Sequence, residues 1–298
     1  MKLTRTIKKG VVGSDARYVK DALYSLGYLT KAPTHSLIGS DSDRAIRAFQ
    51  RDNKDMYGRQ LEVDGKVGPL TFAVLQHLLI DSTLLDVLQP TDYKNISKAT
   101  LETINKDLLN VTDIRVRMVA HLLQFAYDDK GIKRDPSSLY IYGANLFDEK
   151  LQLHIATEAY IRKRAKARPE YFTKGRMEWM IEKANTGEIA CGDCSGAIVG
   201  ALRIEGLVKP SFDVTANRFL SNQYSKDIRK AELRPADFVG RSGHIGLYAG
   251  GGKVIEFVGG AYTCQITELD SRKARNFITG TLDTMSGWTS CRSPKFYS

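Results

Sequence analysis

The chain has 298 residues, of which 42% are hydrophobic and 26% are charged, a composition typical of folded domains and a length that favours two of them. It contains no apolar run of about 18 residues or more, so we expect no membrane span. The net charge of +10 is spread along the chain and favours polyanionic partners, but no nucleic-acid-binding motif accompanies it, so no nucleic acid is expected as a partner.

The first ten residues are basic, but no apolar segment of about 7–15 residues follows them, as a secretory signal would require. We therefore expect the protein to be made in the cytoplasm without a signal peptide. Export from the cytoplasm would then require a route other than a signal peptide.

Two segments near the N-terminus repeat with a period of 29 residues. Each begins with a glycine, which permits a tight turn, and a hydroxyl residue three positions later can bond a free backbone N–H in the first helical turn. The apolar residues that follow recur on one helix face, and a similar stripe around Val19 and Leu23 predicts another helix upstream. The sequence therefore predicts a three-helix domain over about residues 8–82. The aligned units are Gly39-x-x-Ser42-x-x-Ala45-Ile46-x-x-Phe49-Gln50 and Gly68-x-x-Thr71-x-x-Val74-Leu75-x-x-Leu78-Leu79.

The second repeat unit resembles the peptidoglycan-binding domain found beside many wall hydrolases. The resemblance is carried by Val63-Asp64-Gly65-Lys66-Val67-Gly68-x-x-Thr71. It implies that residues 1–85 bind bacterial peptidoglycan, with anionic wall polymers as further candidate partners. The alternative left open by the residues is a helical bundle without a ligand.

The middle of the chain combines a polar segment, a tyrosine-rich run and a basic run. Residues 86–111 are polar and weakly helical and predict a linker, followed by a second domain over residues 112–298 with a helical insertion at about 146–190. A tyrosine-rich run before the insertion, from Leu139 to Gly143, predicts a strand. The insertion carries the densest basic run, from Arg162 to Arg168, which is read either as a solvated helix face or as a contact for a phosphate-rich partner.

Four cysteines occur, and two of them, Cys191 and Cys194, form a C-x-x-C motif. A structural zinc site would need a second such pair or two suitably spaced histidines, and a thioredoxin-like redox pair would follow the strand of a βαβ unit. The sequence offers neither context, so both are minor alternatives, and we expect no metal and no cofactor. Spacing leaves the state of Cys191, Cys264 and Cys291 open.

Cys194 opens an apolar stretch that predicts a helix, since Ile198 and Leu202 lie one helical turn apart. Unpaired N–H groups and the helix dipole favour a thiolate at such a position. Most single cysteines are buried and inert. Here Asp193 and Ser195 flank the thiol and a glycine follows, so the context indicates a candidate nucleophile.

Residues 244–258 alternate around a glycine cluster and predict a β-hairpin. A three-residue loop would pair Tyr248 with Gly252 and set His244 directly opposite Glu256 on one face. A two-residue loop would place them on opposite faces unless a bulge restored the match. A carboxylate beside an imidazole fixes its tautomer and stabilises the imidazolium, whereas the alternative is an ordinary surface pair.

Together these motifs resemble the NlpC-type cell-wall cysteine peptidases over about residues 112–298. The resemblance implies an α+β fold with a papain-like catalytic domain, in which a helix-borne cysteine packs on an antiparallel sheet. It assigns Cys194 as nucleophile, His244 as base, Glu256 as the orienting third residue, Tyr140 as a helper of the oxyanion, and Asp193 and Ser195 to the substrate groove.

The chain departs from this pattern in three places. Glutamate stands at position 256 where histidine is usual, the insertion separates the tyrosine run from the cysteine, and Pro235-Ala236-Asp237 replaces proline-glycine-aspartate. Glutamate can also orient an imidazole, so the mechanism is kept. The change does raise an amidase as an alternative, because the related CHAP-type hydrolases use similar Cys–His chemistry.

The two resemblances together predict a peptidoglycan hydrolase, a cysteine endopeptidase that cleaves the wall stem peptide between D-glutamate and the diamino acid. A wall-binding domain without a signal peptide resembles a phage endolysin, which acts on the wall after release. The alternatives are an N-acetylmuramoyl-L-alanine amidase, a bacterial autolysin, a tail-associated wall hydrolase, and a wall-binding protein whose catalytic domain is silent. Replacing Glu256 by glutamine is expected to slow turnover and leave the fold intact. The oligomeric state is not indicated.

Overall fold

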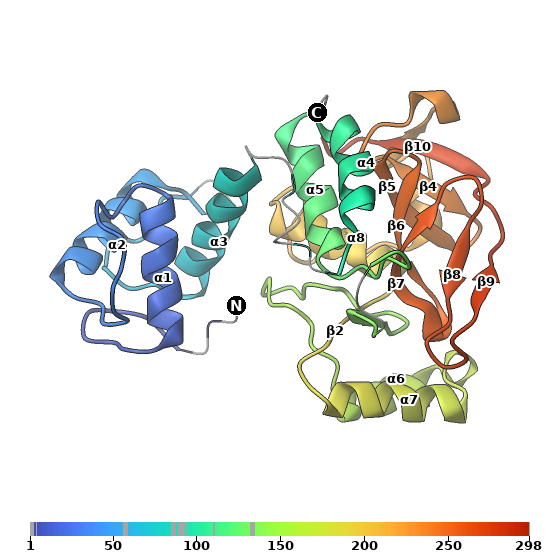
Figure 1. The fold of residues 1–298 in the computed structure, drawn as a ribbon, viewed down its shortest axis with the longest axis horizontal. Coiled ribbons are helices and arrows are strands. Elements are labelled where there is room, and N and C mark those ends of the chain that lie inside the picture. The colour runs from blue at the N-terminus through green and yellow to red at the C-terminus, as the bar shows by residue number, and fades with distance from the viewer. Residues whose placement is uncertain are drawn as a thin grey trace. The chain divides into compact units, whose positions relative to one another are not determined.

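The protein is mixed α and β, and it forms two compact units, Met1–Asp86 and Val87–Ser298, each described by itself (Figure 1). The computed structural model describes residues 3, 5–55, 59–84, 88, 93, 95–109, 111–131 and 135–297.

The first unit contains three helices, as the repeat predicts: α1 (Ser14–Ser25), α2 (Ser40–Asp52) and α3 (Pro69–Leu84). The second and third helices each begin directly after the glycine of a repeat unit, Gly39 or Gly68. Their apolar stripes point inward, where burial of hydrophobic surface stabilises the unit. The core includes Ile7, Val19, Leu23, Ile46, Phe49, Val67 and Leu75.

A six-stranded antiparallel sheet forms the centre of the second unit, with the order β3-β10-β4-β5-β6-β7. The sequence neighbours β4 to β7 lie side by side, which is the arrangement that short hairpin connections favour. The strands are β3 (Ser225–Asp227), β4 (Phe238–Arg241), β5 (His244–Gly250), β6 (Lys253–Val258), β7 (Thr263–Glu268) and β10 (Ser290–Pro294).

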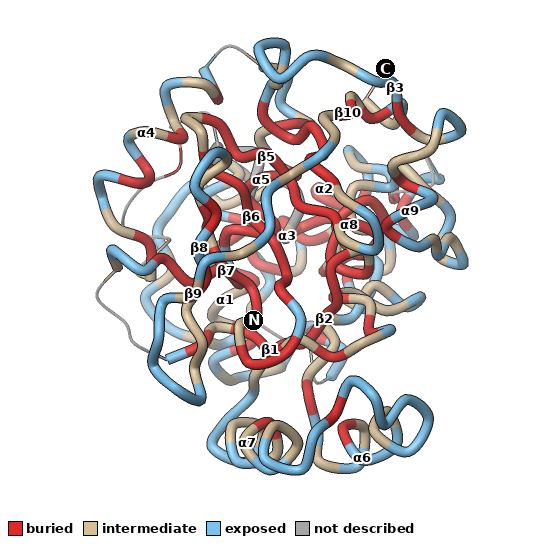
Figure 2. The backbone as a smooth tube through the Cα atoms, turned by 90° about the vertical axis from the view of Figure 1, so that its right-hand side faces the viewer, coloured by how far each residue is buried: buried red, intermediate tan, exposed pale blue. Residues whose placement is uncertain are grey.

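Helices α4 (Lys98–Leu108), α5 (Asp113–Leu123) and α8 (Cys194–Ile204) pack against this sheet. Helix α8 is apolar along most of its length, so it is buried against β5 and β6 (Figure 2). Helix α4 lies inside the segment expected to be a linker, yet it packs against β5, and the Gly251 N–H donates to Asp107 Oδ2 (2.7 Å). The short helix α9 (Ala216–Phe219) also contacts β5.

The segment between the tyrosine run and Cys194 contains two helices, α6 (Glu158–Ala167) and α7 (Lys174–Asn185). A 3₁₀ turn from Pro169 to Tyr171 separates them, because proline cannot continue the hydrogen bonding of a helix. The two helices form a layer of their own at one end of the unit (Figures 1 and 2). Two more 3₁₀ turns (Lys230–Glu232 and Gly260–Tyr262) and the pair β8 (Lys273–Arg275) and β9 (Leu282–Thr284) complete the unit.

Within the described part of the chain, the helices are all too short or too polar to cross a membrane.

Candidate functional site

Cys194 is the first residue of α8, and the preceding residue, Asp193, caps this helix. Asp193 Oδ1 accepts hydrogen bonds from the backbone N–H groups of Ser195 (3.1 Å) and Gly196 (2.7 Å), while Oδ2 accepts one from Gly143 (2.6 Å). The Ser195 hydroxyl also donates to Oδ1 (3.1 Å). The carboxylate therefore fixes the start of the helix and with it the position of the thiol, a structural use that the sequence analysis did not assign to Asp193.

Cys194 is buried, with 7% of the residue exposed. Burial raises its pKa to about 12, and the nearby Asp193 carboxylate acts in the same direction. Backbone N–H groups of Ile245, Ser195 and Cys194 itself lower the pKa, but burial outweighs them. The sequence argument that the helix start favours a thiolate therefore captures only the smaller effect, and Cys194 rests as a neutral thiol.

Tyr140 lies beside this thiol although the insertion separates them in sequence. Strand β1 (Ser138–Tyr140) pairs in parallel with β2 (Ala190–Gly192), so Tyr140 stands next to Gly192, two residues before Cys194. Burial raises the pKa of Tyr140, and the neighbouring Cys194 and Asp193 raise it further. The phenol therefore stays protonated and can donate a hydrogen bond.

His244 begins β5 and reaches Glu256 on β6, but in a different register from the predicted one. Leu247 pairs with Ile255, which places Gly246 and not His244 opposite Glu256. The loop has two residues, and a bulge between Tyr248 and Gly250 shifts the ladder. The bulge returns His244 and Glu256 to one face, and His244 Nε2 lies 2.6 Å from Glu256 Oε2. The predicted pair forms, although the predicted three-residue loop is wrong.

Glu256 is completely buried and accepts several hydrogen bonds in addition to the contact with His244. Thr267 Oγ1 donates to Oε1 (2.6 Å), and Arg272 donates to both oxygens, through Nε (2.7 Å) and Nη2 (2.5 Å). Burial would raise the pKa of Glu256, but the bonds from Arg272 and His244 outweigh it and lower the pKa to about 2. Glu256 is therefore a carboxylate at any ordinary pH.

Trp288 completes the surroundings of the imidazole. Its ring stacks on His244 with 5.5 Å between centroids and 11° between planes, and the Arg272 guanidinium lies 4.5 Å from its centroid. Sequence reasoning did not identify Arg272, Thr267 or Trp288. No local motif marks them, because each comes from a segment after the hairpin and only the fold brings it to Glu256.

The two halves of the site meet at Ile245, the residue after His244. Helix α8 packs on β5, and the Ile245 N–H reaches the Cys194 sulfur. Since His244 uses Nε2 for Glu256, its Nδ1 is the ring nitrogen left for proton exchange with another group. The arrangement can supply a nucleophile, a base and a group that orients the base.

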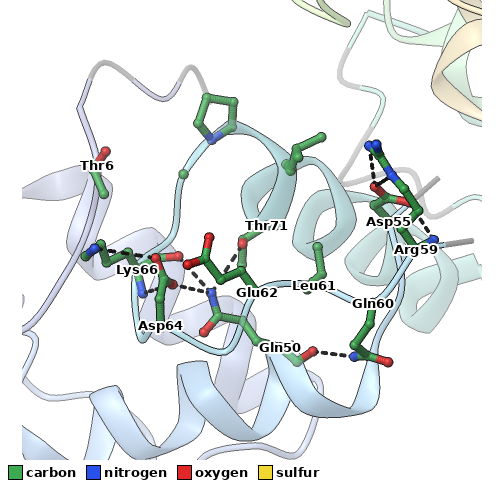
Figure 3. A pocket seen from close by; sticks show the side chains of 13 residues that line it. Thr6, Gln50, Asp55, Arg59, Gln60, Leu61, Glu62, Asp64, Lys66 and Thr71 are labelled. Carbon is green, nitrogen blue, oxygen red and sulfur yellow. Dashed lines mark hydrogen bonds and ion pairs between the residues drawn. The ribbon is translucent and has the colours of Figure 1, made fainter. Parts of the chain in front are cut away.

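The first unit carries a separate pocket of about 690 Å³, between the end of α2 and the start of α3 (Figure 3). Its lining combines carboxylates, cations and amides with a few apolar side chains, a mixture suited to a polar ligand with some apolar groups. The lining residues are Thr6, Gln50, Asp55, Arg59, Gln60, Leu61, Glu62, Asp64, Lys66, Gly68, Pro69, Leu70 and Thr71.

Gln50 organises this pocket from its buried position on α2 (Figure 3). Its side-chain amide donates to Asp64 Oδ1 (2.9 Å) and to Thr71 Oγ1 (3.4 Å), and its carbonyl oxygen accepts from the Gly65 N–H (2.9 Å). The Thr71 hydroxyl thus binds a side chain, whereas the sequence predicted a bond to a free backbone N–H. Because Gln50 joins the two repeat units, the wall of the pocket is held in place by hydrogen bonds.

Residues 12–75 match the model of the family described as a putative peptidoglycan binding domain. The match contains α1, α2 and most of the pocket, and it supports the predicted N-terminal peptidoglycan-binding domain and peptidoglycan as a partner. Residues 76–298, which carry the cysteine site, lie outside this match. No curated protein and no solved structure matches the chain.

Proposed function

From an N-terminal peptidoglycan-binding domain followed by a Cys–His–Glu site, we propose that the protein is a peptidoglycan hydrolase of the NlpC type. The observation that carries the proposal is the junction on β5, where the Ile245 N–H reaches the Cys194 sulfur and the preceding residue, His244, is held by Glu256. The wall-binding domain supplies the substrate class, because binding one polymer beside a nucleophile raises the local concentration of its bonds. The bond proposed is the one between D-glutamate and the diamino acid of the stem peptide.

The proposed reaction is acyl transfer through a thioester. The Cys194 proton moves to His244 Nδ1 as the sulfur attacks the peptide carbonyl, so the S–C bond forms and the thiol is activated only at that moment. His244 then gives the proton to the leaving amine as the C–N bond breaks. Afterwards it removes a proton from the water that attacks the thioester, and it returns this proton to the Cys194 sulfur as the S–C bond breaks. The Cys194 N–H at the helix start, with the Tyr140 hydroxyl, would stabilise the oxyanion.

An amidase that releases the whole stem peptide from the glycan is the second candidate, since the same Cys–His–Glu geometry serves any acyl transfer. Glu256 in the third position is the observation that keeps this candidate open. A phage endolysin, made in the cytoplasm and released to the wall, is the proposed setting, with a bacterial autolysin or a tail-associated hydrolase as alternatives.

The test is digestion of purified bacterial sacculi by the wild-type protein and by Cys194→Ala, with Cys291→Ala as the matched control because Cys291 lies on β10, outside the site. Mass spectrometry of the released fragments identifies the bond. New peptide termini with wild type and Cys291→Ala, and none with Cys194→Ala, are expected. Free stem peptides would identify an amidase, new sugar reducing ends would refute the peptidase, and no release from several wall types would favour a binding protein with a silent second domain.

We further propose that the pocket of the first unit holds the wall ligand. Leu70 lines it and is 46% exposed, whereas Val12 is 55% exposed and is not among the lining residues. Leu70→Asp and Val12→Asp therefore add the same charge to the same kind of surface position. If the pocket binds the wall, only Leu70→Asp weakens retention of the protein on sacculi.

A further inference from the structure

Arg272 makes a two-point contact with the carboxylate of Glu256. Its Nε and Nη2 donate to the two carboxylate oxygens (2.7 and 2.5 Å), and its Nη1 donates to the backbone oxygen of Ser286 (2.7 Å). The Arg272 side chain is only 4% exposed, and its guanidinium lies over the Trp288 ring. This ion pair is therefore held on several sides and screened little by water.

The Glu256–Arg272 ion pair changes the net charge next to His244. A carboxylate alone at 2.6 Å from Nε2 would strongly stabilise an imidazolium. Arg272 supplies a positive charge to the same carboxylate, so the Glu256–Arg272 pair is neutral as a unit, and the attraction for a proton on His244 is correspondingly reduced.

We propose that Arg272, held by Trp288, neutralises Glu256 and so keeps the proton on the Cys194 sulfur in the resting site. Arg272 is then a positioning residue that acts through Glu256, and the inference rests on the proposed function for its catalytic meaning. Among the described residues, ionisable groups near this pair include Arg241, opposite His244 on β4, and Cys264 on β7, close to Glu256. They are the same in every variant below, so they do not change the comparison.

The contacts between these groups give the direction in which the Arg272 charge affects ionisation of Cys194. Arg272 binds Glu256, and Glu256 binds His244, whereas the Cys194 sulfur contacts β5 at the Ile245 N–H. A positive charge at Arg272 therefore weakens the help that the Glu256 carboxylate gives to transfer of the thiol proton to the imidazole. Removing that charge should favour this transfer and raise the thiolate population of Cys194 about tenfold.

Alkylation of Cys194 by iodoacetamide measures this population without any substrate. The thiolate forms the S–C bond, iodide leaves, and peptide mapping by mass spectrometry separates Cys194 from the other cysteines. At neutral pH we expect Arg272→Gln to be alkylated about tenfold faster than wild type. Arg272→Lys, which keeps the charge, should react at the wild-type rate.

Arg115→Gln is the matched control for loosening of the unit, because Arg115 forms another buried ion pair, with Asp237 (2.8 Å). Its alkylation rate should equal that of wild type. An unchanged or slower rate in folded Arg272→Gln, or an equal increase in Arg115→Gln, would overturn the proposal.

The wild-type protein provides a second measurement that needs no variant to fold. A neutral resting pair predicts alkylation that rises continuously with pH as the thiol ionises, whereas a thiolate–imidazolium pair gives a plateau of fast reaction between about pH 5 and pH 8. Such a plateau would refute the neutral resting state. Failure of the proposed hydrolase activity shows separately, in the digestion of sacculi, because alkylation does not depend on it.

Discussion

Replacing Glu256 by glutamine should unfold the second unit more easily as well as slow the reaction. The carboxylate is fully buried, and glutamine keeps its shape but removes the charge that Arg272 needs. Breaking a buried ion pair by removing one partner costs about 3–5 kcal/mol, because the remaining charge is left uncompensated. The expectation from sequence, slower turnover with an intact fold, therefore changes once the structure shows Arg272 beside Glu256.

Urea unfolding followed by tryptophan fluorescence can measure this cost in the second unit alone, because both tryptophans of the chain, Trp179 and Trp288, belong to that unit. Glu256→Gln and Arg272→Met should each lower the free energy of unfolding by about 3–5 kcal/mol. The double variant should lose much less than the sum, since neither charge is then left alone in the interior.

Turnover on sacculi should fall about 100-fold in Glu256→Gln, because the imidazole loses the partner that fixes its tautomer. The stability argument fails if Glu256→Gln costs less than about 1 kcal/mol, or if the two single losses add in the double variant. Unchanged turnover would mean that another group orients His244.

Further predictions concern the wall-binding pocket, salt and pH. Leu70→Asp should weaken retention on sacculi by about tenfold, or 1.4 kcal/mol, with Val12→Asp unchanged, and equal losses in co-sedimentation would contradict the pocket assignment. Binding to sacculi should weaken between about 0.1 M and about 1 M salt, where the screening length falls from about 10 Å to about 3 Å, since the protein carries a net charge of +10; constant binding would exclude an electrostatic contribution. The pKa of Glu256 is lowered to about 2 from its ordinary 4.5, so its stabilisation is complete above about pH 4.5 and is lost as the pH falls towards 2. The difference in unfolding free energy between wild type and Glu256→Gln should therefore stay level from about pH 8 to about pH 5, and a decline within that range would point to another group.

Local features of both units could be predicted from the sequence because short-range interactions determine them. The helices after Gly39 and Gly68 follow from glycine turns and apolar periodicity, and Asp193 ahead of Cys194 is a capping residue at a helix start. These interactions span only a few residues, so the local sequence is enough to predict where these helices begin.

The local sequence of the hairpin predicts only part of its geometry. Alternation of side chains predicts that His244 and Glu256 share a face, and a register error of two positions leaves that prediction correct. The bulge next to Gly250 and the loop of two glycines depend on how the strand packs, with Gly250 and Gly251 lying against α4. The sequence alone could therefore indicate the pair but not its register.

The sequence by itself determined the three-helix unit, the start of α8 and the partnership of His244 with Glu256, since each rests on contacts between near neighbours. Only the tertiary structure decided that Tyr140 stands beside Gly192, that Arg272 and Trp288 enclose the Glu256–His244 pair, and that burial keeps Cys194 a thiol. These features join segments separated by an insertion or by several strands. Their energetics depend on how far burial removes water from charged groups and on the partners that offset this cost, which no local pattern of residues records.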